Sequence, residues 1–529
     1  MGNFAGEVEF FLAPGIGVTA TAFSKAGAEA RSGTICATRT LEANAGTANA
    51  PTRSAGEDGA EGYALKKNNF GGIFMDSELI KNYKSFLTNG KTERECVARI
   101  IQMAEKKGFK DISEYKKLKA GDKVYITKLN KAIGLFEIGT NPVENGINFL
   151  CAHIDSPRLD AKQNPVYEKD FITYLNTHYY GGIKKYQWTA LPLAIHGVVC
   201  KKDGTTVKVV IGEDADDPVF CISDILPHLA QEQMEETASN FIKGEDLDLI
   251  LGSENPPAKD KETESKEKSA ENLENKDKSK KLVLQLLKEK YGIEEADFQS
   301  AELEVVPAGA ARDLGIDRSL ILSYGQDDRS CAFTSVQAIL DTPATKRTNC
   351  TLCVDKEEIG SYGCTGMSSA LLDNMVAEII ARTDEIYSEL TLRRCLANSK
   401  MLSSDVNAAY DPLNGGLFDR DNTSYLGGGF TFQKYTGSRG KSGANDANPE
   451  FIAKVRNLMD NAGVTYQMAE LGKVDQGGGG TIAHYAADYG MEVLDAGVAV
   501  LSMHAPWEIT SKFDIEQIYK GNCAFLKLE

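Results

Sequence analysis

The chain has 529 residues, 42% of them hydrophobic and 26% charged, which is the balance of a folded globular protein. Its 59 basic and 76 acidic residues give a formal net charge of −17, so we expect no nucleic-acid partner, because phosphate binding needs a basic surface. No run of about eighteen apolar residues occurs, and we expect no membrane-spanning helix either. The N-terminus lacks the basic stretch of a secretory signal and the 11 cysteines are irregularly spaced, so we expect reduced thiols and a cytoplasmic protein.

Residues 1–64 differ in composition from the sequence that follows. They are rich in Ala, Gly, Thr and Ser and show almost no apolar periodicity. Such a segment cannot bury enough apolar surface to offset the entropy that is lost when it becomes ordered. We expect a disordered extension; the alternatives are a functional tail and sequence foreign to the functional gene product.

Residues 65–165 are expected to form the first part of a catalytic α/β domain. Apolar residues at helical spacing predict two helices, and two buried strands follow them. The elements expected are helices over 78–87 and 93–109 and strands over 123–139 and 146–155. The last strand ends at His153 and Asp155, and α/β sheets bind their ligands at the carboxyl ends of strands.

Residues 166–306 are expected to form an inserted, β-rich domain, because the five fragments with metal-ligand chemistry all lie outside this stretch. Alternating residues around an Asp-Gly turn predict a hairpin over 196–214. A charged run without aromatic residues at 253–281 predicts a mobile loop. A helix over 282–292 and a strand over 301–308 are expected to follow it.

Residues 307–529 are expected to complete the catalytic domain, because turns, helices and apolar strands alternate again. The elements expected are a turn and helix over 323–340, strands with loops over 349–360 and 400–411, and an apolar strand over 493–504. The last of these strands ends at His504. Four fragments with metal-ligand chemistry therefore lie at predicted strand ends or in the loops after them.

Five short fragments carry the side chains that metal-assisted hydrolysis requires. They are CAHID with His153 and Asp155, GQDDR with Asp327, DKEEIG with Glu357 and Glu358, SSDVN with Asp405, and SMHAP with His504. Two histidines and at least three carboxylates suit a pair of divalent cations, with one carboxylate bridging them. A free glutamate nearby would take a proton from the hydrolytic water.

Each fragment by itself also has a simpler interpretation. His153 is typical of a packed strand histidine, although Asp155 faces the same side and can accept a hydrogen bond from its second ring nitrogen. The two acids of GQDDR also suit the start of a helix, and Asp405 also suits a turn. Adjacent Glu357 and Glu358 repel each other, so one ligand beside one base explains them better than a surface loop.

Taken together, CAHIDSPRLD, GQDDRSCAF, DKEEIGSYG, SSDVNAAYDP and SMHAPWE resemble the aspartyl aminopeptidase and aminopeptidase I family of dinuclear metallopeptidases. THYYGGIKKYQW, LPLAIHG and QKYTGSRGKSGANDAN resemble it too, and the resemblance covers about residues 65–529. It implies an α/β fold with a mixed central sheet flanked by helices, and an inserted β-rich domain that makes dimer contacts.

The resemblance also implies a role for each candidate residue. The metal ligands would be His153 and Asp405 for one ion, Glu358 and His504 for the other, and Asp327 as the bridge. Asp328 is the competing choice for the bridge. Asp155 would orient His153, and Glu357 would be the general base.

Two further residues would contact the substrate, and the family assembles into large oligomers. His196 matches a family histidine that reaches a neighbouring subunit's site, and the alternative is a packed strand histidine. Lys434 would pair with an acidic side chain or with the substrate backbone, and the alternative is a loop position. The family usually holds zinc, although cobalt or manganese can serve, and it forms tetrahedral dodecamers built from dimers.

We therefore expect a cytoplasmic, dinuclear zinc aminopeptidase that acts on peptides with a free N-terminus. The alternatives are a related two-metal amidohydrolase acting on N-acyl amino acids and a catalytically silent scaffold. GQDDR and SMHAP depart from the branch that removes acidic residues, so the sequence leaves acidic and neutral N-terminal residues both open.

Overall fold

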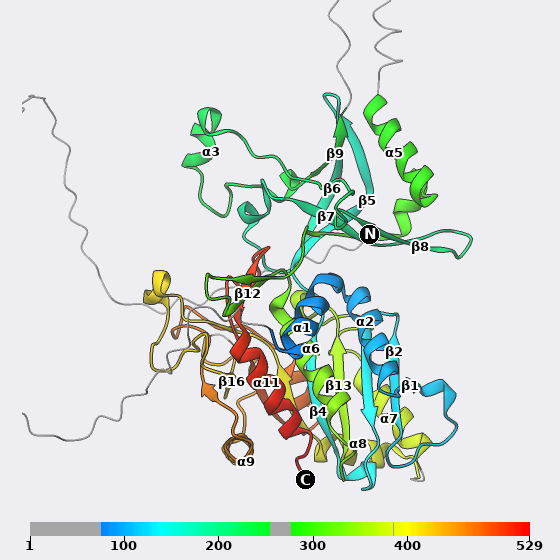
Figure 1. Ribbon diagram of the computed structural model, residues 1–529, viewed down its shortest axis with the longest axis vertical. Helices are drawn as coiled ribbons and strands as arrows, with labels where there is room; N and C mark the ends of the chain where they lie inside the picture. The colour runs from blue at the N-terminus through cyan, green and yellow to red at the C-terminus, as the bar shows by residue number, and fades with distance from the viewer. Residues whose placement is uncertain (1–75, 254–276, 384–385, 438) are drawn as a thin grey trace, which may run out of the picture. The chain divides into compact units, whose positions relative to one another are not determined.

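A computed structural model describes residues 76–253, 277–383, 386–437 and 439–529. The extension expected at residues 1–64 and most of the charged run at 253–281 lie outside these ranges. Within the described part of the chain, no helix has both the length and the apolar character needed to cross a membrane. The strands of this part form three sheets, and helices pack against them (Figure 1).

The largest sheet has nine strands and is mixed. Across the sheet the order is β1 (Lys110–Asp111), β2 (Lys123–Lys128), β3 (Ala132–Glu137), β13 (Thr348–Val354), β4 (Ile147–His153), β14 (Lys400–Ser404), β18 (Glu492–Gly497), β16 (Phe430–Gln433) and β17 (Tyr466–Met468). β13, β4, β14 and β18 are parallel neighbours at the centre, and β3 and β16 pair antiparallel with this block on its two sides. The α/β fold with a mixed central sheet, expected from the sequence, is confirmed.

Helices cover both faces of the nine-stranded sheet (Figure 1). On one face lie α1 (Glu78–Asn89), α2 (Glu93–Lys106), α6 (Gln326–Asp341), α9 (Pro449–Ala462) and α11 (Lys512–Phe525). On the other face lie α7 (Leu371–Arg382), α8 (Glu389–Asn398) and α10 (Ala483–Ala487). Along β4, Leu150 and Ala152 pack into the first layer and Phe149 and Cys151 into the second. The strand is therefore buried on both sides, as parallel strands usually are.

Short 3-10 helices lie in several of the connections. They are η1 (Ile112–Glu114), η2 (Val143–Asn145), η3 (Lys185–Trp188), η4 (Pro227–Leu229), η5 (Gly244–Asp246), η6 (Glu295–Ser300), η7 (Glu357–Ile359) and η8 (Pro412–Leu417). Of these, η7 carries the adjacent glutamates that the sequence singled out.

A six-stranded sheet is inserted between the two halves of the larger sheet. Its order is β8 (Thr206–Ile211), β7 (Leu193–Cys200), β10 (Ala301–Pro307), β5 (Arg158–Lys169), β6 (Ile172–Tyr180) and β9 (Leu249–Ser253). Helix α5 (Lys278–Tyr291) packs on this sheet, and the short helix α3 (Gln231–Glu235) lies in the same insertion. β7 and β8 form the hairpin predicted over 196–214.

The six-stranded sheet begins at Arg158, ahead of the boundary expected at residue 166. β5 has few apolar residues, and its pairing with β6 shifts register between Ala161 and Val166. Apolar alternation, on which a strand prediction depends, therefore does not mark the beginning of β5.

The third sheet has five strands and includes part of the segment that was expected to form a single strand over 493–504. Its order is β11 (Arg312–Leu314), β12 (Leu320–Ser323), β20 (Glu508–Ser511), β19 (Ala499–Leu501) and β15 (Asn407–Ala408). The single strand expected over 493–504 is thus two strands, β18 in the nine-stranded sheet and β19 in this one. A Cβ at Gly497 would lie 1.9 Å from the carbonyl oxygen of Asp405, so only glycine permits this crossing between the two sheets.

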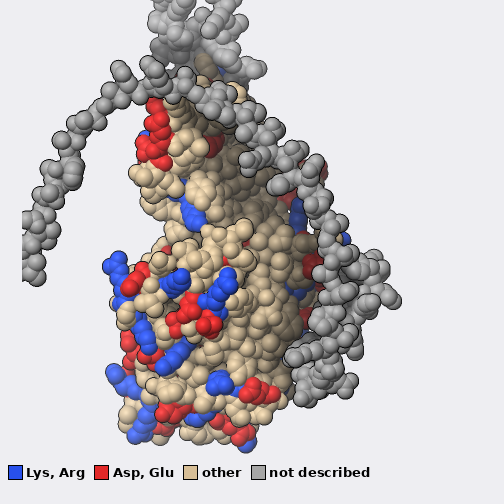
Figure 2. Space-filling view, turned by 90° about the vertical axis from the view of Figure 1, so that its left-hand side faces the viewer, with Lys and Arg blue, Asp and Glu red and all other residues tan. Residues whose placement is uncertain are grey.

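Charged side chains of both signs are mixed on the face that Figure 2 shows. Lysine and arginine side chains lie among aspartate and glutamate side chains there, and neither sign gathers into an extended patch. This face therefore lacks the basic footprint that binding to a phosphate backbone needs.

Candidate active site

The side chains with metal-ligand chemistry gather at the carboxyl ends of the central parallel strands. His153 is the last residue of β4, Asp405 directly follows β14, and Glu357 and Glu358 begin η7 just after β13. Val354 at the end of β13 is the register partner of His153, so the loops that carry these residues begin side by side. Sequence motifs that are far apart in the chain therefore meet at one edge of the sheet.

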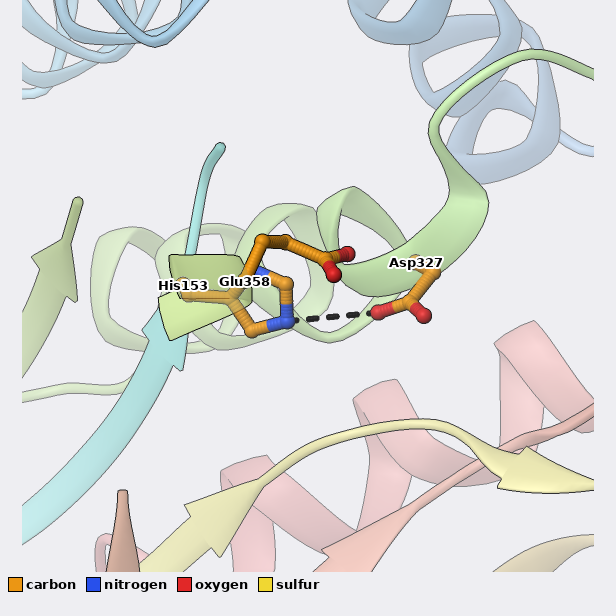
Figure 3. A group of neighbouring side chains, drawn as sticks. All are labelled: His153, Asp327 and Glu358. Carbon is orange, nitrogen blue, oxygen red and sulfur yellow. Dashed lines mark ion pairs between the residues drawn. The ribbon is translucent and has the colours of Figure 1, made fainter. Parts of the chain in front are cut away.

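The carboxylate of Asp327, near the start of α6, lies between the two histidines. Its Oδ1 is 3.2 Å from Nε2 of His153, and its Oδ2 is 3.2 Å from Nε2 of His504. Figure 3 shows the first of these contacts, with the Glu358 carboxylate beside it. A carboxylate that presents one oxygen to each of two imidazoles has the geometry of a bridge between two cations.

The carboxylates of Asp405 and Glu358 each pair with a different histidine. Nε2 of His153 is 3.8 Å from Oδ1 of Asp405, and Nε2 of His504 is 3.7 Å from Oε2 of Glu358. Two overlapping groups in the cluster each offer three ligand atoms within 4.8 Å of one another. The first group is His153, Asp327 and Glu358, and the second is His153, Glu357 and Asp405.

The electrostatics of the cluster fit divalent cations. Burial, joined by the charge of Asp405, raises the pKa of Glu357 to about 8. Burial and Asp327 raise the pKa of Glu358 well above its ordinary value, and Oε1 of Glu358 is buried with no hydrogen-bond partner among the described residues. Crowded carboxylates raise one another's pKa values, and a bound cation reverses this effect. The imidazole and carboxylate donors, with one oxygen left unpaired, suit zinc or a similar divalent ion.

Asp155 is fully buried and holds three parts of the site. Its Oδ1 is 3.4 Å from Nδ1 of His153, which is the contact predicted from the sequence. Its carboxylate also accepts hydrogen bonds from the amides of Glu357 and Glu358, both at 3.2 Å, and from the hydroxyl of Tyr180 at 2.8 Å. Burial would raise the pKa of Asp155, but His153 and Tyr180 lower it below its ordinary value. An ionised Asp155 therefore orients both the histidine and the glutamate pair.

Glu508 is a buried site residue that the sequence analysis missed. Its Oε1 accepts a hydrogen bond from the amide of His504 at 2.8 Å, and its Oε2 accepts one from the amide of Asp327 at 3.0 Å. His504 has a φ of 64°, which is uncommon outside glycine, so this hydrogen bond supports an unfavourable backbone conformation. The available signal was a single acid at the end of SMHAPWE, which a surface loop explains equally well.

Asp328 contacts neither histidine in the way that Asp327 does. Both of its carboxylate oxygens are buried and have no hydrogen-bond partner among the described residues. Burial and the charge of Asp405 raise the pKa of Asp328 well above its ordinary value. The geometry therefore favours Asp327 over Asp328 as the bridging carboxylate.

The structure does not bring His196 or Lys434 into this cluster. His196 is buried in β7, with Nδ1 3.1 Å from Oε1 of Glu95 and Nε2 3.0 Å from Oε1 of Glu213. Both ring nitrogens thus face carboxylates of the same chain, which is the arrangement of a packed strand histidine. Lys434 follows β16 and forms an ion pair with Asp446 at 3.9 Å.

We expect the buried ion pairs of His196 to stabilise the fold in a pH-dependent way. Burial alone would lower its pKa, but Glu213 and Glu95 raise the pKa of His196 above its ordinary value. The resulting stability is fully present below the unfolded pKa of about 6.5 and is lost as pH rises through the folded pKa. Replacing His196 by glutamine should lower the free energy of unfolding by about 3 kcal/mol at pH 6, and by less as pH approaches 9.

Urea titrations at several pH values measure this difference. His178→Gln is the matched control, because His178 is exposed. A His196→Gln deficit that stays constant or grows between pH 6 and pH 9 would contradict the expectation.

A cavity of about 540 Å³ opens beside the cluster. Besides the metal-site residues, its lining includes the neutral side chains of Gln433, Thr436, Leu471, Tyr485 and Met503. No lysine or arginine occurs among the described residues that line it. The cavity can therefore hold a peptide N-terminus against the cluster. Among its described lining residues, no lysine or arginine could pair with an acidic side chain of the substrate.

Comparison with known proteins decides the family. Residues 86–526 match the family described as aminopeptidase I zinc metalloprotease (M18). The chain belongs to this family. An M18 relative from Clostridium acetobutylicum, named a probable M18 family aminopeptidase 1, is 55% identical over 448 residues, which is 84% of this chain and 93% of that protein.

Solved structures agree with the assignment to the M18 family. The crystal structure of an M18 aminopeptidase from Thermotoga maritima has a TM-score of 0.79 at 41% identity, covering 86% of this chain and 98% of that one. The structure of the S. cerevisiae mApe1 dodecamer has a TM-score of 0.66 at 20% identity, covering 85% of this chain and 96% of that one, and shares the fold. The M18 chain is thus an aminopeptidase of a zinc metalloprotease family, and the family expected from the sequence is confirmed.

Proposed function

We propose that this M18 aminopeptidase hydrolyses the first peptide bond of peptides with a free N-terminus at a centre of two divalent cations. The observation that carries the proposal is the position of Asp327, whose two oxygens each lie 3.2 Å from the Nε2 atom of a different histidine. One cation would be held by His153 and Asp405, the other by Glu358 and His504, and both by Asp327. Zinc is the first choice for both ions, and cobalt or manganese is the alternative.

Glu357 is the proposed general base. When bound, the two cations would polarise the scissile carbonyl and lower the pKa of the hydrolytic water. A carboxylate oxygen of Glu357 lies within 4.8 Å of ligand atoms of His153 and Asp405, and Asp155 holds its amide. From this position Glu357 takes a proton from the water and returns it to the leaving amine.

The lining of the cavity favours substrates whose N-terminal residue has a neutral side chain. Its apolar lining side chains include Leu471, Tyr485 and Met503, and its described lining residues include no lysine or arginine. An acidic substrate side chain would enter beside several carboxylates and lose hydration without gaining a lysine or arginine partner. Contacts of His196 and Lys434 with substrate stay predictions.

A panel of aminoacyl p-nitroanilides with leucine, methionine, lysine, aspartate and glutamate tests this function. We expect kcat/KM for leucine to exceed that for aspartate by about 10-fold or more, because one uncompensated polar mismatch costs at least about 1.4 kcal/mol. N-acetyl-leucine p-nitroanilide is the matched control and should not be cleaved. Preferred cleavage of the acetylated compound would instead identify an amidohydrolase, and preferred cleavage of the aspartyl compound would overturn the specificity.

We also propose a cytoplasmic homo-oligomer, a tetrahedral dodecamer built from dimers that meet through the inserted sheet. The supporting observations are the dodecameric S. cerevisiae relative and a row of exposed apolar residues in the insertion. These residues are Ile225, Leu226, Leu229 and Met234. The described cysteines are free, which suits a reducing compartment. Light scattering on the purified full chain measures the oligomeric state.

A further inference from the structure

The end of strand β6 lies in the candidate active site although β6 belongs to the inserted sheet. Tyr180 is the last residue of this strand, and Gly181 and Gly182 follow it. In these three residues, here called the Tyr180–Gly182 segment, Tyr180 contacts Asp155, Gly182 contacts His504, and Gly181 leaves no room for a side chain beside Glu358. The inserted sheet therefore contacts the catalytic domain at the candidate active site.

Tyr180 acts on the carboxylate that orients the glutamate pair. Its buried hydroxyl donates to Oδ2 of Asp155 at 2.8 Å, and the same oxygen accepts a hydrogen bond from the amide of Glu358. The guanidinium of Arg158 lies over the Tyr180 ring, 3.8 Å from its centroid, and so restricts the orientation of the ring. The hydroxyl group is thus held at one point and fixes the Asp155 carboxylate there.

The two glycines lie beside His504 and Glu358, the proposed ligands of the second cation. The carbonyl oxygen of Gly182 accepts a hydrogen bond from Nδ1 of His504 at 2.8 Å, which leaves Nε2 to face Asp327 and Glu358. Gly181 has a φ of 76°, and a Cβ at this position would lie 3.2 Å from Oε2 of Glu358. A side chain at Gly181 would therefore strain the backbone and displace Glu358.

We propose that Tyr180 is a positioning residue of the peptidase centre, so that the inserted sheet supplies part of the active site as well as surface for assembly. The inference rests on the metal-dependent function proposed above. Partners of metal-ligating residues fix the orientation and basicity of the ligands, and their loss typically costs about 10- to 100-fold in metal affinity or activity. Tyr180 would act on Asp155, and through it on His153, Glu357 and Glu358.

Tyr180→Phe in the full chain tests the proposal, because it removes the hydroxyl and keeps the ring. We expect zinc affinity, measured by competition with a chromogenic chelator, to fall by about 10-fold or more. We expect kcat on a leucyl reporter to fall by a similar factor while KM changes by less than about 2-fold, because Tyr180 is buried and is not among the described residues that line the cavity. Tyr179→Phe is the matched control: Tyr179 is the neighbouring residue, is exposed and should show neither change.

Gly181→Ala is the second variant, and it guards against a Tyr180→Phe protein that fails to fold. Its added Cβ should lower zinc affinity by displacing Glu358. Wild-type zinc affinity and kcat in a folded Tyr180→Phe protein would overturn the positioning role of Tyr180, and the same result in a folded Gly181→Ala protein would overturn the contribution of the Tyr180–Gly182 segment to the position of Glu358. If the wild-type protein binds zinc but cleaves no aminoacyl substrate, the proposed function fails, while the zinc affinities still test the role of Tyr180.

Discussion

Replacing Glu357 by glutamine is expected to lower kcat by about 10²- to 10⁴-fold while leaving bound metal nearly unchanged. The amide side chain keeps the shape of the glutamate but cannot take a proton from the hydrolytic water. The metal ions should stay because the contacts of the two histidines with Asp327, Asp405 and Glu358 do not involve Glu357. Initial rates on the leucyl reporter and elemental analysis of the same samples measure the two quantities.

Two matched variants sharpen the experiment on Glu357. Glu358→Gln should lower the metal content as well as kcat, because Glu358 is a proposed ligand and its oxygen lies 3.7 Å from His504. Glu389→Gln, at the exposed start of α8, should change neither. A Glu357→Gln protein with wild-type kcat would show that another group is the base, and one that loses its metal would make Glu357 a ligand.

Replacing Asp327 by alanine is expected to remove both metal ions, whereas replacing Asp405 by alanine should remove only one. In the first variant both imidazoles lose the carboxylate between them, and two cations close together would no longer share a negative bridge. In the second variant only the cation beside His153 loses a ligand. Elemental analysis after dialysis should give about two zinc ions per chain for the wild type, about one for Asp405→Ala and far fewer than one for Asp327→Ala.

Asp328→Asn is the control for the neighbouring carboxylate. Asp328 is buried and forms no ion pair with either histidine like those of Asp327, so an amide of the same shape should replace its carboxyl group with little loss of metal. Retention of metal by Asp327→Ala together with loss by Asp328→Asn would transfer the bridging role to Asp328. Equal loss from Asp327→Ala and Asp405→Ala would contradict the division of the ligands between two ions.

Several of the proposed ligands could be predicted because they stand beside a local signal. His153 closes the apolar run INFLCA, and His504 follows the apolar run VAVLSM, so each lies where a buried strand is expected to end. Glu357 and Glu358 stood out because adjacent carboxylates are unfavourable unless a function requires them. These patterns depend on neighbours in the sequence and so need no knowledge of distant contacts.

The residues that hold the ligands could not be predicted in the same way. Tyr180, at the end of β6, donates to Asp155 over 25 positions, and Glu508 accepts from the amide of Asp327 over 181 positions. A tyrosine or a glutamate at the end of a strand has many ordinary explanations. The role of each residue depends on which atom its side chain faces, and this is set by the folding of the chain.

The sequence by itself predicted the reaction class and a candidate set of metal ligands, because metal chemistry depends on residue types and their spacing, and its resemblance to a known family implied the mixed α/β sheet. The tertiary structure decided how those ligands are arranged. It placed the Asp327 carboxylate between two imidazoles, divided the strand expected over 493–504 at Gly497, and brought the Tyr180–Gly182 segment of the insertion to the site. Each of these depends on contacts between distant segments, and only the packing of the folded chain brings such segments together.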